Sequence, residues 1–207
     1  MKTFSKIKIA AISLVLLAFN ANVQAVTFDL AKDFFSANKV GSPWMLGYYD
    51  AKGIFIRFEQ FDGNNRWLGG NADIWLHTGS KADFGIVPGH ISLHADTGTP
   101  VARFVVPYTA IFNIKVDIGG PTDLMIKGSG NKNTNLAGLK VNGVLKPQTS
   151  FNNNKKIWIL NNMQLNQGQV IDAYVGQDYI SGNTDTMFKV TSPDPIPIPA
   201  PINGRFL

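Results

Sequence analysis

Residues 101–119 show the clearest alternation of hydrophobic and polar positions in this chain. In the second half of the segment, large apolar residues occupy every second position from Phe112 to Ile118, and polar or charged residues lie between them. The first half follows the same rule from Ala102 to Val106. This period-two pattern predicts a hairpin of two β-strands joined at a proline, with one face in a core and the other in water. Because a hairpin alone is barely stable in water, more strands must cover its apolar face, and we expect a β-sandwich.

Similar short apolar segments recur along the chain between turn signals. The turns are rich in Gly, Pro, Asn and Asp, as at residues 62–65 and at Asn142-Gly143. The further strands expected are residues 26–30, 44–49, 54–61, 72–78, 84–87, 90–94, 124–127, 139–144, 157–160, 170–175 and 187–190. No stretch has the spacing of a convincing amphipathic helix. About a dozen short strands at this spacing predict an all-β fold, an antiparallel β-sandwich of jelly-roll type.

The two ends of the chain differ from the rest. Residues 1–25 predict a secretory signal peptide, because three lysines precede an apolar run at 9–19, and small residues at 23–25 then offer a cleavage position. The run is shorter than a membrane span of about 20 residues, so we expect export without membrane insertion, to the extracellular space, the periplasm or the cell surface. Residues 26–191 then form one β-sandwich domain. Residues 192–207 form a C-terminal tail in which proline occupies every second position from Pro193 to Pro201, and this predicts a stiff polyproline II segment.

Charge and cysteine content narrow the function classes. The formal net charge is +5, but three of the lysines lie in the predicted signal peptide, and no basic stripe remains of the kind that nucleic acid requires. We therefore expect no nucleic-acid partner. The chain has no cysteine, which excludes thiol catalysis and cysteine-based zinc sites.

Several short motifs, in order along the chain, resemble those of a group of secreted bacterial jelly-roll modules. These modules open with D-L-x-x-D-F-S and N-P-x-G-x-W-x-Y-G, and some occur in PEP-CTERM exoproteins. The matching residues here are Asp29, Leu30, Asp33, Phe34, Asn38, Gly41, Trp44, Gly47, Ser92, Leu93, His94, Arg103, Phe104, Pro107, Phe112, Val141, Asn142, Gly143, Leu165, Gly168, Ile171, Asp172, Val175, Gly176, Asp185 and Thr186. The resemblance implies a jelly-roll fold and a carbohydrate-binding role. The chain departs from the pattern at Ala95-Asp96 and Gln169, and its tail lacks the hydrophobic helix and basic end of a PEP-CTERM anchor.

Aromatic residues near turns are the candidates for carbohydrate binding. Sugars stack their apolar faces on exposed rings, while amides and carboxylates bind the hydroxyl groups. Trp67 lies between two turn-forming segments, so we expect its ring to be exposed and Trp67→Ala to weaken glycan binding without unfolding the domain. The remaining candidate ligand-binding residues are Tyr49, Trp75, Trp158 and His94. For each aromatic residue the alternative is packing in the core.

Four aspartates at the motif-bearing ends of the chain are candidate metal ligands. The terminal strands of a sandwich are often neighbours, so Asp29, Asp33, Asp172 and Asp185 are predicted to supply oxygen ligands to one structural calcium ion. The alternative is that Asp33 and Asp185 cap turns and Asp172 faces water. No catalytic residues are predicted. A glycosidase needs two carboxylates across the sugar, and the only glutamate, Glu59, lies on a predicted strand beside Arg57.

The sequence therefore predicts a secreted, non-catalytic module that binds a polysaccharide or a cell-surface glycan. Two other functions stay open. One is a structural or adhesive extracellular matrix protein that self-associates through strand edges or through its tail. The other is a polysaccharide-active enzyme on a jelly-roll scaffold.

Overall fold

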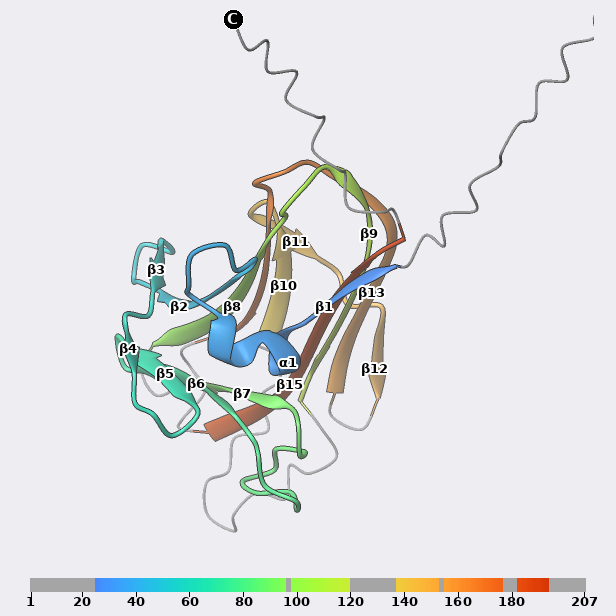
Figure 1. The fold of residues 1–207 in the computed structure, drawn as a ribbon. Helices are drawn as coiled ribbons and strands as arrows, with labels where there is room; N and C mark the ends of the chain where they lie inside the picture. The colour runs from blue at the N-terminus through green and yellow to red at the C-terminus, as the bar shows by residue number, and fades with distance from the viewer. Residues whose placement is uncertain (1–24, 96–97, 120–136, 153–154, 177–181, 194–207) are drawn as a thin grey trace, which may run out of the picture.

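The computed structural model describes residues 25–95, 98–119, 137–152, 155–176 and 182–193, which form two antiparallel β-sheets packed face to face (Figure 1). The strands of the first sheet, sheet A, are β1 (Val26–Asp29), β4 (Gln60–Phe61), β5 (Arg66–Gly69), β6 (Ala72–Leu76), β7 (Ile91–Ala95), β9 (Ala110–Ile118), β12 (Ser150–Asn152), β13 (Lys155–Leu165) and β15 (Gly182–Ser192). Those of sheet B are β2 (Trp44–Tyr49), β3 (Phe55–Arg57), β8 (Thr99–Val105), β10 (Ala137–Val141), β11 (Val144–Lys146) and β14 (Val170–Val175). A short helix α1 (Leu30–Asp33) and a 3-10 turn η1 (Phe34–Ser36) follow β1.

The chain passes repeatedly between the two sheets. Sheet A has the order β12-β13-β9-β15-β7-β6-β5-β4, with β1 beside β15, and sheet B has the order β11-β10-β14-β8-β2-β3. From β7 to β15 the long strands alternate between sheets, with the short strands β11 and β12 added as hairpin partners at one edge of each. This connectivity confirms the predicted antiparallel β-sandwich of jelly-roll type.

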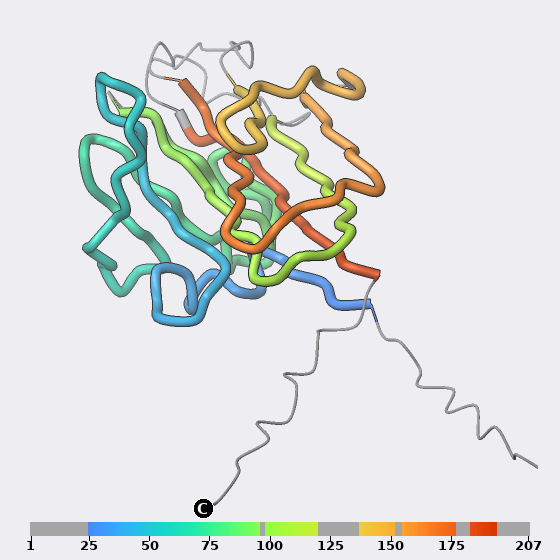
Figure 2. Tube along the Cα trace, turned by 90° about the horizontal axis from the view of Figure 1, so that it is seen from above, coloured from blue at the N-terminus to red at the C-terminus, as the bar shows by residue number. Residues whose placement is uncertain are grey.

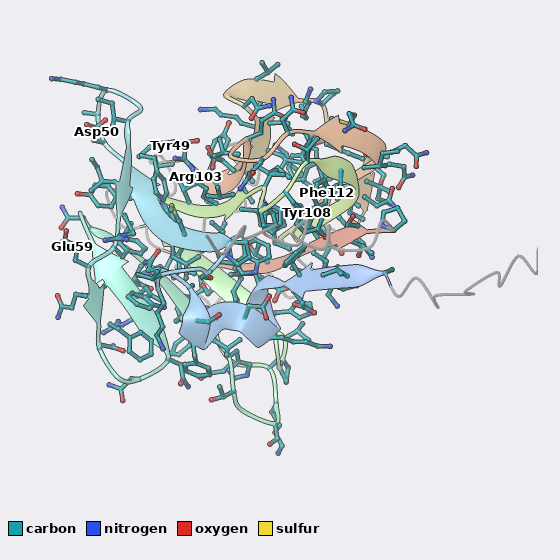
Figure 3. The ribbon with its side chains drawn as sticks, turned by 45° about the horizontal axis from the view of Figure 1, so that its top comes forward. Tyr49, Asp50, Glu59, Arg103, Tyr108 and Phe112 are labelled. Atoms are coloured by element: carbon teal, nitrogen blue, oxygen red, sulfur yellow. The ribbon has the colours of Figure 1, made fainter. Side chains whose placement is uncertain are left out.

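Residues 101–119 do form two strands with the predicted parity, but the predicted hairpin is wrong. Strand β8 pairs with β2 and β14 in sheet B, whereas β9 pairs with β13 and β15 in sheet A. The link between them is an arch across the sandwich, and the ring of Tyr108 packs beneath it against Phe112 at a centroid distance of 5.7 Å (Figure 3). Alternation along a strand reports which face is buried and carries no information about the partner strand.

The structure also divides one expected strand and does not form another. Residues 54–61 are not continuous, because β3 belongs to sheet B and β4 belongs to sheet A. The change of sheet occurs at Phe58, whose ring is 1 % exposed between the layers. At residues 84–87 the backbone forms only an isolated bridge between Asp83 and Ile86. The strand expected at 124–127 lies outside the described residues.

The core is the layer of side chains between the sheets, and its centre is aromatic. Trp44 is fully buried, and its indole lies 4.9 Å from the rings of both Phe104 and Phe188, which come from different sheets. Phe112 continues this cluster at 6.4 Å from Phe104. Each such buried ring contributes about 1.5–3 kcal/mol relative to an exposed one, so the cluster supplies a large part of the attraction between the sheets.

A polar clamp holds the start of the domain to sheet B. Asn38 adopts a left-handed backbone conformation, with φ of 61°, which asparagine tolerates better than most residues. Its side-chain oxygen accepts a hydrogen bond from the amide of Leu46 at 2.7 Å. Its side-chain nitrogen donates to the carbonyl groups of Leu46 and Phe58 at 3.0 and 3.1 Å. Asn38 therefore ties the strand β2 to the crossing point at Phe58.

The first and last described strands lie side by side. Strand β1 pairs with the end of β15, with Val26 opposite Ser192, so the chain enters and leaves the sandwich at one place (Figure 2). Strand β15 continues to Ser192, one residue beyond the predicted domain boundary. The predicted signal peptide, apart from its last residue, and the tail from residue 194 onward lie outside the described residues. Within the described part of the chain, no helix has the length and apolar character to cross a membrane.

Candidate functional site

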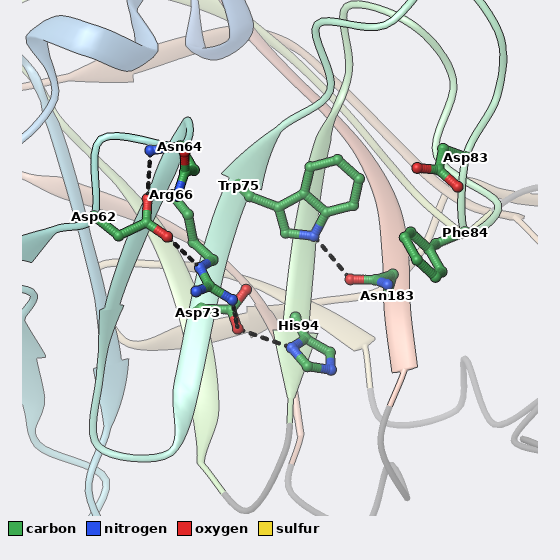
Figure 4. A pocket seen from close by; sticks show the side chains of 9 residues that line it. All are labelled: Asp62, Asn64, Arg66, Asp73, Trp75, Asp83, Phe84, His94 and Asn183. Atoms are coloured by element: carbon green, nitrogen blue, oxygen red, sulfur yellow. Dashed lines mark hydrogen bonds and ion pairs between the residues drawn. The ribbon is translucent and has the colours of Figure 1, made fainter.

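A recess of about 360 Å³ lies on the outer face of sheet A, away from the core (Figure 4). It is lined by aromatic, acidic, amide and basic side chains from β5, β6, β7, β15 and the loops beside them. The lining residues are Asp62, Asn64, Arg66, Asp73, Trp75, Asp83, Phe84, His94 and Asn183. This recess is the candidate functional site.

The register of sheet A brings these residues together. On β6, Asp73 and Trp75 alternate with buried residues of the core and so point away from it. Asp73 lies opposite His94 of β7, which in turn lies opposite Asn183 of β15. Trp75 lies opposite Arg66 of β5. Residues far apart in the sequence therefore form adjacent rows on one surface.

The ring of Trp75 is held in a fixed position by hydrogen bonds. Its Nε1 donates to Oδ1 of Asn183 at 2.8 Å, and the hydroxyl of Ser92 donates to the same oxygen at 3.0 Å. His77 contacts the ring edge-on, at a centroid distance of 5.7 Å. Figure 4 shows Trp75, Asn183 and Phe84 following one another along the recess. A half-buried indole held from two sides presents a preorganised apolar surface to a ligand.

Charged groups form a chain along the other side of the recess. Nε of Arg66 donates to Asp62 at 2.8 Å, and a second guanidinium nitrogen lies 4.0 Å from Asp73. Asp73 in turn contacts Nδ1 of His94 at 2.9 Å. Desolvation opposes ionisation of Asp62, but hydrogen bonds from the Asn64 amide and from Arg66 outweigh it, so the pKa of Asp62 lies below its ordinary value. Asp62 is therefore an anionic hydrogen-bond acceptor at neutral pH.

Phe84 lies at the rim of the recess in a tight turn. Asp83 and Ile86 exchange backbone hydrogen bonds at 3.2 and 2.8 Å, with Phe84 and Gly85 between them. Both central residues have positive φ, 47° for Phe84 and 81° for Gly85, as in a type I′ turn. Phenylalanine is an unfavourable residue for this backbone conformation. Core packing does not explain its presence, because the residue is 54 % exposed. An exposed ring held in a strained backbone is a feature that often marks a functional site.

The structure places two of the five predicted ligand-binding residues in the recess. Trp75 and His94 line it, whereas the other three side chains are buried. The expectation that the Trp67 ring is exposed is wrong: it is 9 % exposed, points into the core from β5 and contacts Phe61 at 5.0 Å. The turns on both sides belong to the ends of a four-residue strand, and they explain the polar surroundings of Trp67 without exposing it.

Trp158 and Tyr49 are also held by the fold. Trp158 is 2 % exposed in the core, and its Nε1 donates to the carbonyl of Lys146 at 3.1 Å. Tyr49 lies on the outer face of sheet B, but it is only 9 % exposed, and its hydroxyl donates to Asp172 at 2.6 Å. Neither ring presents an open face of the kind that we expected for sugar stacking.

The four predicted calcium ligands do not meet. Oδ2 of Asp33 accepts hydrogen bonds from the indole of Trp44 at 3.0 Å and from the amide of Asp29 at 3.2 Å. Asp29 caps helix α1 through the amide of Ala31 and pairs with Lys189 at 3.0 Å. The acidic side chains at this end of the chain are thus occupied by capping, ion pairing and the core indole.

Asp172 and Asp185 lie on different sheets, each with its own partners. Asp172 is 2 % exposed and accepts two hydrogen bonds from Arg103, at 2.7 and 2.9 Å, so the alternative that it faces water is also wrong. Asp185 contacts His90 at 3.0 Å and accepts a hydrogen bond from the amide of Val87 at 3.1 Å. Across the described ranges, no group of three histidine, aspartate or glutamate residues is arranged to hold a metal ion. Calcium binding stays a prediction, to be checked by whether a chelator lowers the Tm, but this ligand set does not form.

Sequence reasoning missed most of the recess. The sequence predicts a strand at 84–87, whereas Phe84 lies in a tight turn of the structure. The sequence identifies Asp62 and Asn64 only as turn residues, and no local pattern marks Arg66 or Asn183 as a ligand-binding residue. Their position depends on the pairing of β5 with β6 and of β15 with β7, which local patterns do not specify.

Comparisons with known proteins identify no family for this chain. No protein-family model and no curated protein matches it. Among solved structures, it is similar to a family 35 carbohydrate-binding module from Clostridium thermocellum, with 13 % sequence identity and a TM-score of 0.37. That match covers 81 % of this chain and 97 % of the module. It is too distant to carry a ligand or the role of any residue from that protein to this chain, which we describe as an antiparallel β-sandwich of jelly-roll type.

Proposed function

We propose that this protein is an exported, non-catalytic module that binds carbohydrate in the recess on sheet A. One observation carries the proposal: the rings of Trp75 and Phe84 border a single recess whose remaining walls are carboxylate, amide, guanidinium and imidazole groups. Sugars have apolar C–H faces and a rim of hydroxyl groups, so they need this combination of ring surfaces and polar groups.

Each part of the recess has a place in this proposal. The indole of Trp75 stacks against the sugar, and Asn183 and His77 hold the ring in the position that stacking requires. Phe84 covers a second sugar unit or a ring edge at the rim. Asp62 is anionic and accepts hydrogen bonds from hydroxyl groups, while His94 and Arg66 are available as donors. These groups are preorganised by their mutual contacts, which lowers the entropy cost of binding.

The same contacts favour binding over catalysis. A glycosidase needs one carboxylic acid with a raised pKa and a second carboxylate at a defined distance across the sugar. In the recess the pKa of Asp62 is lowered instead, and its carboxylate is engaged by Arg66. Asp73 is engaged by His94 in the same way. A turnover assay with polysaccharides that the protein binds would overturn the non-catalytic part of the proposal if it detected cleavage.

A glycan array and affinity electrophoresis in neutral polysaccharides test the proposal directly. The wild-type protein should be retained by at least one glycan, and Trp75→Ala should weaken that retention by about tenfold, as loss of a stacking ring does. Phe151→Ala is the control, because it removes an aromatic ring that is 53 % exposed and lies outside the recess, on strand β12 at the far edge of sheet A. Equal retention of the wild type and Trp75→Ala, with both folded, would overturn the proposed site.

Self-association is a second candidate function, and it has its own structural support. Strands β11 and β12 form the same edge of the two sheets, and β13 is next to β12. This edge carries four large exposed apolar side chains: Val144, Leu145, Phe151 and Ile159. Open strand edges with apolar residues are sites where further strands add. Sedimentation velocity should then show a concentration-dependent oligomer that Leu145→Lys abolishes, and a monomer at all concentrations would exclude this function.

A further inference from the structure

The outer face of sheet B carries a second group of aromatic and charged side chains, separate from the recess. We call it the platform, and its residues are Tyr49, Phe55, Arg103, Lys140, Asp172 and Tyr174. They come from five neighbouring strands, β2, β3, β8, β14 and β10, and the register aligns them on one face. Figure 3 shows Tyr49 and Arg103 close together on this side of the sandwich.

Two rings of the platform lie against glycines of the sheet. A Cβ atom added to Gly138 would collide with the ring of Tyr174, and one added to Gly47 would collide with the ring of Phe55. Both glycines lie on the outward parity of their strands, opposite Tyr174 and Arg57 respectively. The rings therefore lie low over the backbone, and the absence of a side chain at each glycine makes the face flat. A flat face with aromatic rings suits an extended ligand better than a compact one.

The positive charges of the platform are not all neutralised. Asp172 binds the guanidinium group of Arg103 through two hydrogen bonds and also accepts the hydroxyl of Tyr49. The ammonium group of Lys140 lies over two tyrosine rings, 4.5 Å from the centroid of Tyr49 and 5.0 Å from that of Tyr174. Among the ion pairs of the described residues, none involves Lys140. Its ammonium group is thus held in place by ring faces and has donors left for an anion.

We propose that the platform binds an extended polysaccharide that carries carboxylate groups. Lys140 binds a carboxylate, exposed Arg57 extends the positive potential along the same face, and the rings of Tyr49 and Tyr174 hold the ammonium group of Lys140 in place. Burial raises the pKa of the Tyr174 hydroxyl, so this group stays protonated and can donate to the ligand. A nucleic acid fits less well, because its regular phosphates require a longer run of cations than Lys140 and Arg57 supply.

The platform and the recess differ in the sign of their charge, which makes their ligands separable. The recess holds three aspartates against one arginine, whereas the only carboxylate of the platform, Asp172, is neutralised by its ion pair with Arg103. This inference does not depend on the proposed function of the recess. Failure at one site leaves the other intact, and the variants below distinguish them.

Affinity electrophoresis of the full-length protein in gels with polygalacturonate, a carboxylated polysaccharide, tests the platform. The wild type should be retarded, and Lys140→Gln should weaken the affinity by about tenfold, the effect of losing one charge-assisted hydrogen bond. Tyr174→Leu should weaken it as well, while keeping an apolar side chain over Gly138. Trp75→Ala should bind polygalacturonate like the wild type. Lys39→Gln removes the same charge from an exposed loop and should also bind normally.

Five outcomes would overturn the proposal. Wild-type affinity in Lys140→Gln would show that the ammonium group is not used. An equal loss in Lys39→Gln would show unspecific charge attraction, and a loss in Trp75→Ala would assign the ligand to the recess. Tighter binding of a single-stranded oligonucleotide than of polygalacturonate, or a dimer that Lys140→Gln dissociates, would assign the face to a different partner.

Discussion

The indole Nε1 of Trp44 donates a hydrogen bond to Oδ2 of Asp33 across 3.0 Å, and this bond joins the first helix to the centre of the core. Trp44 is fully buried between Phe104 and Phe188, so its N–H group has no access to water. Asp33 thereby satisfies the one polar group of the Trp44 side chain. Asp33 and Trp44, eleven positions apart in the sequence, are therefore a structural pair.

Replacing Asp33 should destabilise the domain without changing any ligand site. Asp33→Ala leaves the buried indole N–H unpaired, and we expect a loss of about 1–3 kcal/mol in the free energy of unfolding. Asp33→Asn retains an acceptor oxygen and should lose less. Urea denaturation followed by tryptophan fluorescence measures both. Equal stability of Asp33→Ala and the wild type would show that the bond contributes nothing.

Tyr49 should make the protein sensitive to alkaline pH. Burial, together with the hydrogen bond to Asp172 and its charge, raises the pKa of Tyr49 well above the ordinary 10.0. The neutral phenol is favoured in the folded state, so its contribution is complete below pH 10 and is lost as the pH rises toward the folded-state value. The free energy of unfolding of the wild type should therefore fall above about pH 10, where the phenol of the unfolded chain ionises.

Tyr49→Phe is the variant that checks this relationship. It removes the ionisable group, so it should flatten the alkaline part of the stability profile, and it should cost about 1.5–3 kcal/mol at neutral pH by removing a hydrogen bond to a charged group. The parallel readout is tyrosinate absorbance. The wild type should contain one tyrosine more than the variant that ionises only above the ordinary pKa of tyrosine. Identical pH profiles would contradict the role of Tyr49.

Replacing Phe84 should weaken ligand binding without lowering the stability of the domain. Asparagine tolerates positive φ better than phenylalanine, so Phe84→Asn should relieve backbone strain of roughly 1 kcal/mol, and the Tm should stay equal or rise. The same change removes an exposed ring from the recess. Retention by a neutral polysaccharide that binds the wild type should therefore fall about three- to tenfold, which corresponds to the free energy of one aromatic contact. A lower Tm with unchanged retention would contradict both expectations.

Trp67→Ala should act on stability rather than directly on a ligand. The Trp67 side chain is in the core, and its removal should leave a cavity that costs about 3–5 kcal/mol. Trp75→Ala, at a half-buried position on the outer face, is the comparison and should cost much less. Thermal unfolding of the two variants measures the difference. A Trp67→Ala protein with wild-type Tm and weakened glycan retention would restore the original expectation of an exposed ring.

The fold could be predicted from the sequence because burial and strand periodicity are local. Alternation at 112–118 and the Asn142-Gly143 turn identified strands and a hairpin correctly, and Asn142 and Gly143 both have the positive φ that such a turn needs. Pairing is not local. Strands β8 and β9 are adjacent in sequence and in different sheets, and no residue between them specifies whether the chain folds back or crosses over.

The candidate site could be predicted only in part, for the same reason. Trp75 and His94 were recognised as single residues, but the recess exists because β6, β7 and β15 bring them beside Asn183. Trp67 was misplaced because its polar neighbours in sequence belong to turns, while its partner across the sheet is the core residue Ile74. The four predicted metal ligands lie apart in the structure, because spacing in the sequence does not show which carboxylates accept hydrogen bonds from an indole, an amide or an arginine instead.

The pairing of Val26 with Ser192 has a consequence for how this unit fits into a larger architecture. The points of entry and exit are about 5 Å apart, one strand spacing, so the sandwich can be inserted into a loop of a host protein with little distortion of that loop. Asn183, beside the recess, lies nine residues back along β15, roughly 30 Å from the point of attachment. A sandwich grafted at that point would carry its recess on the distal side, turned away from its host.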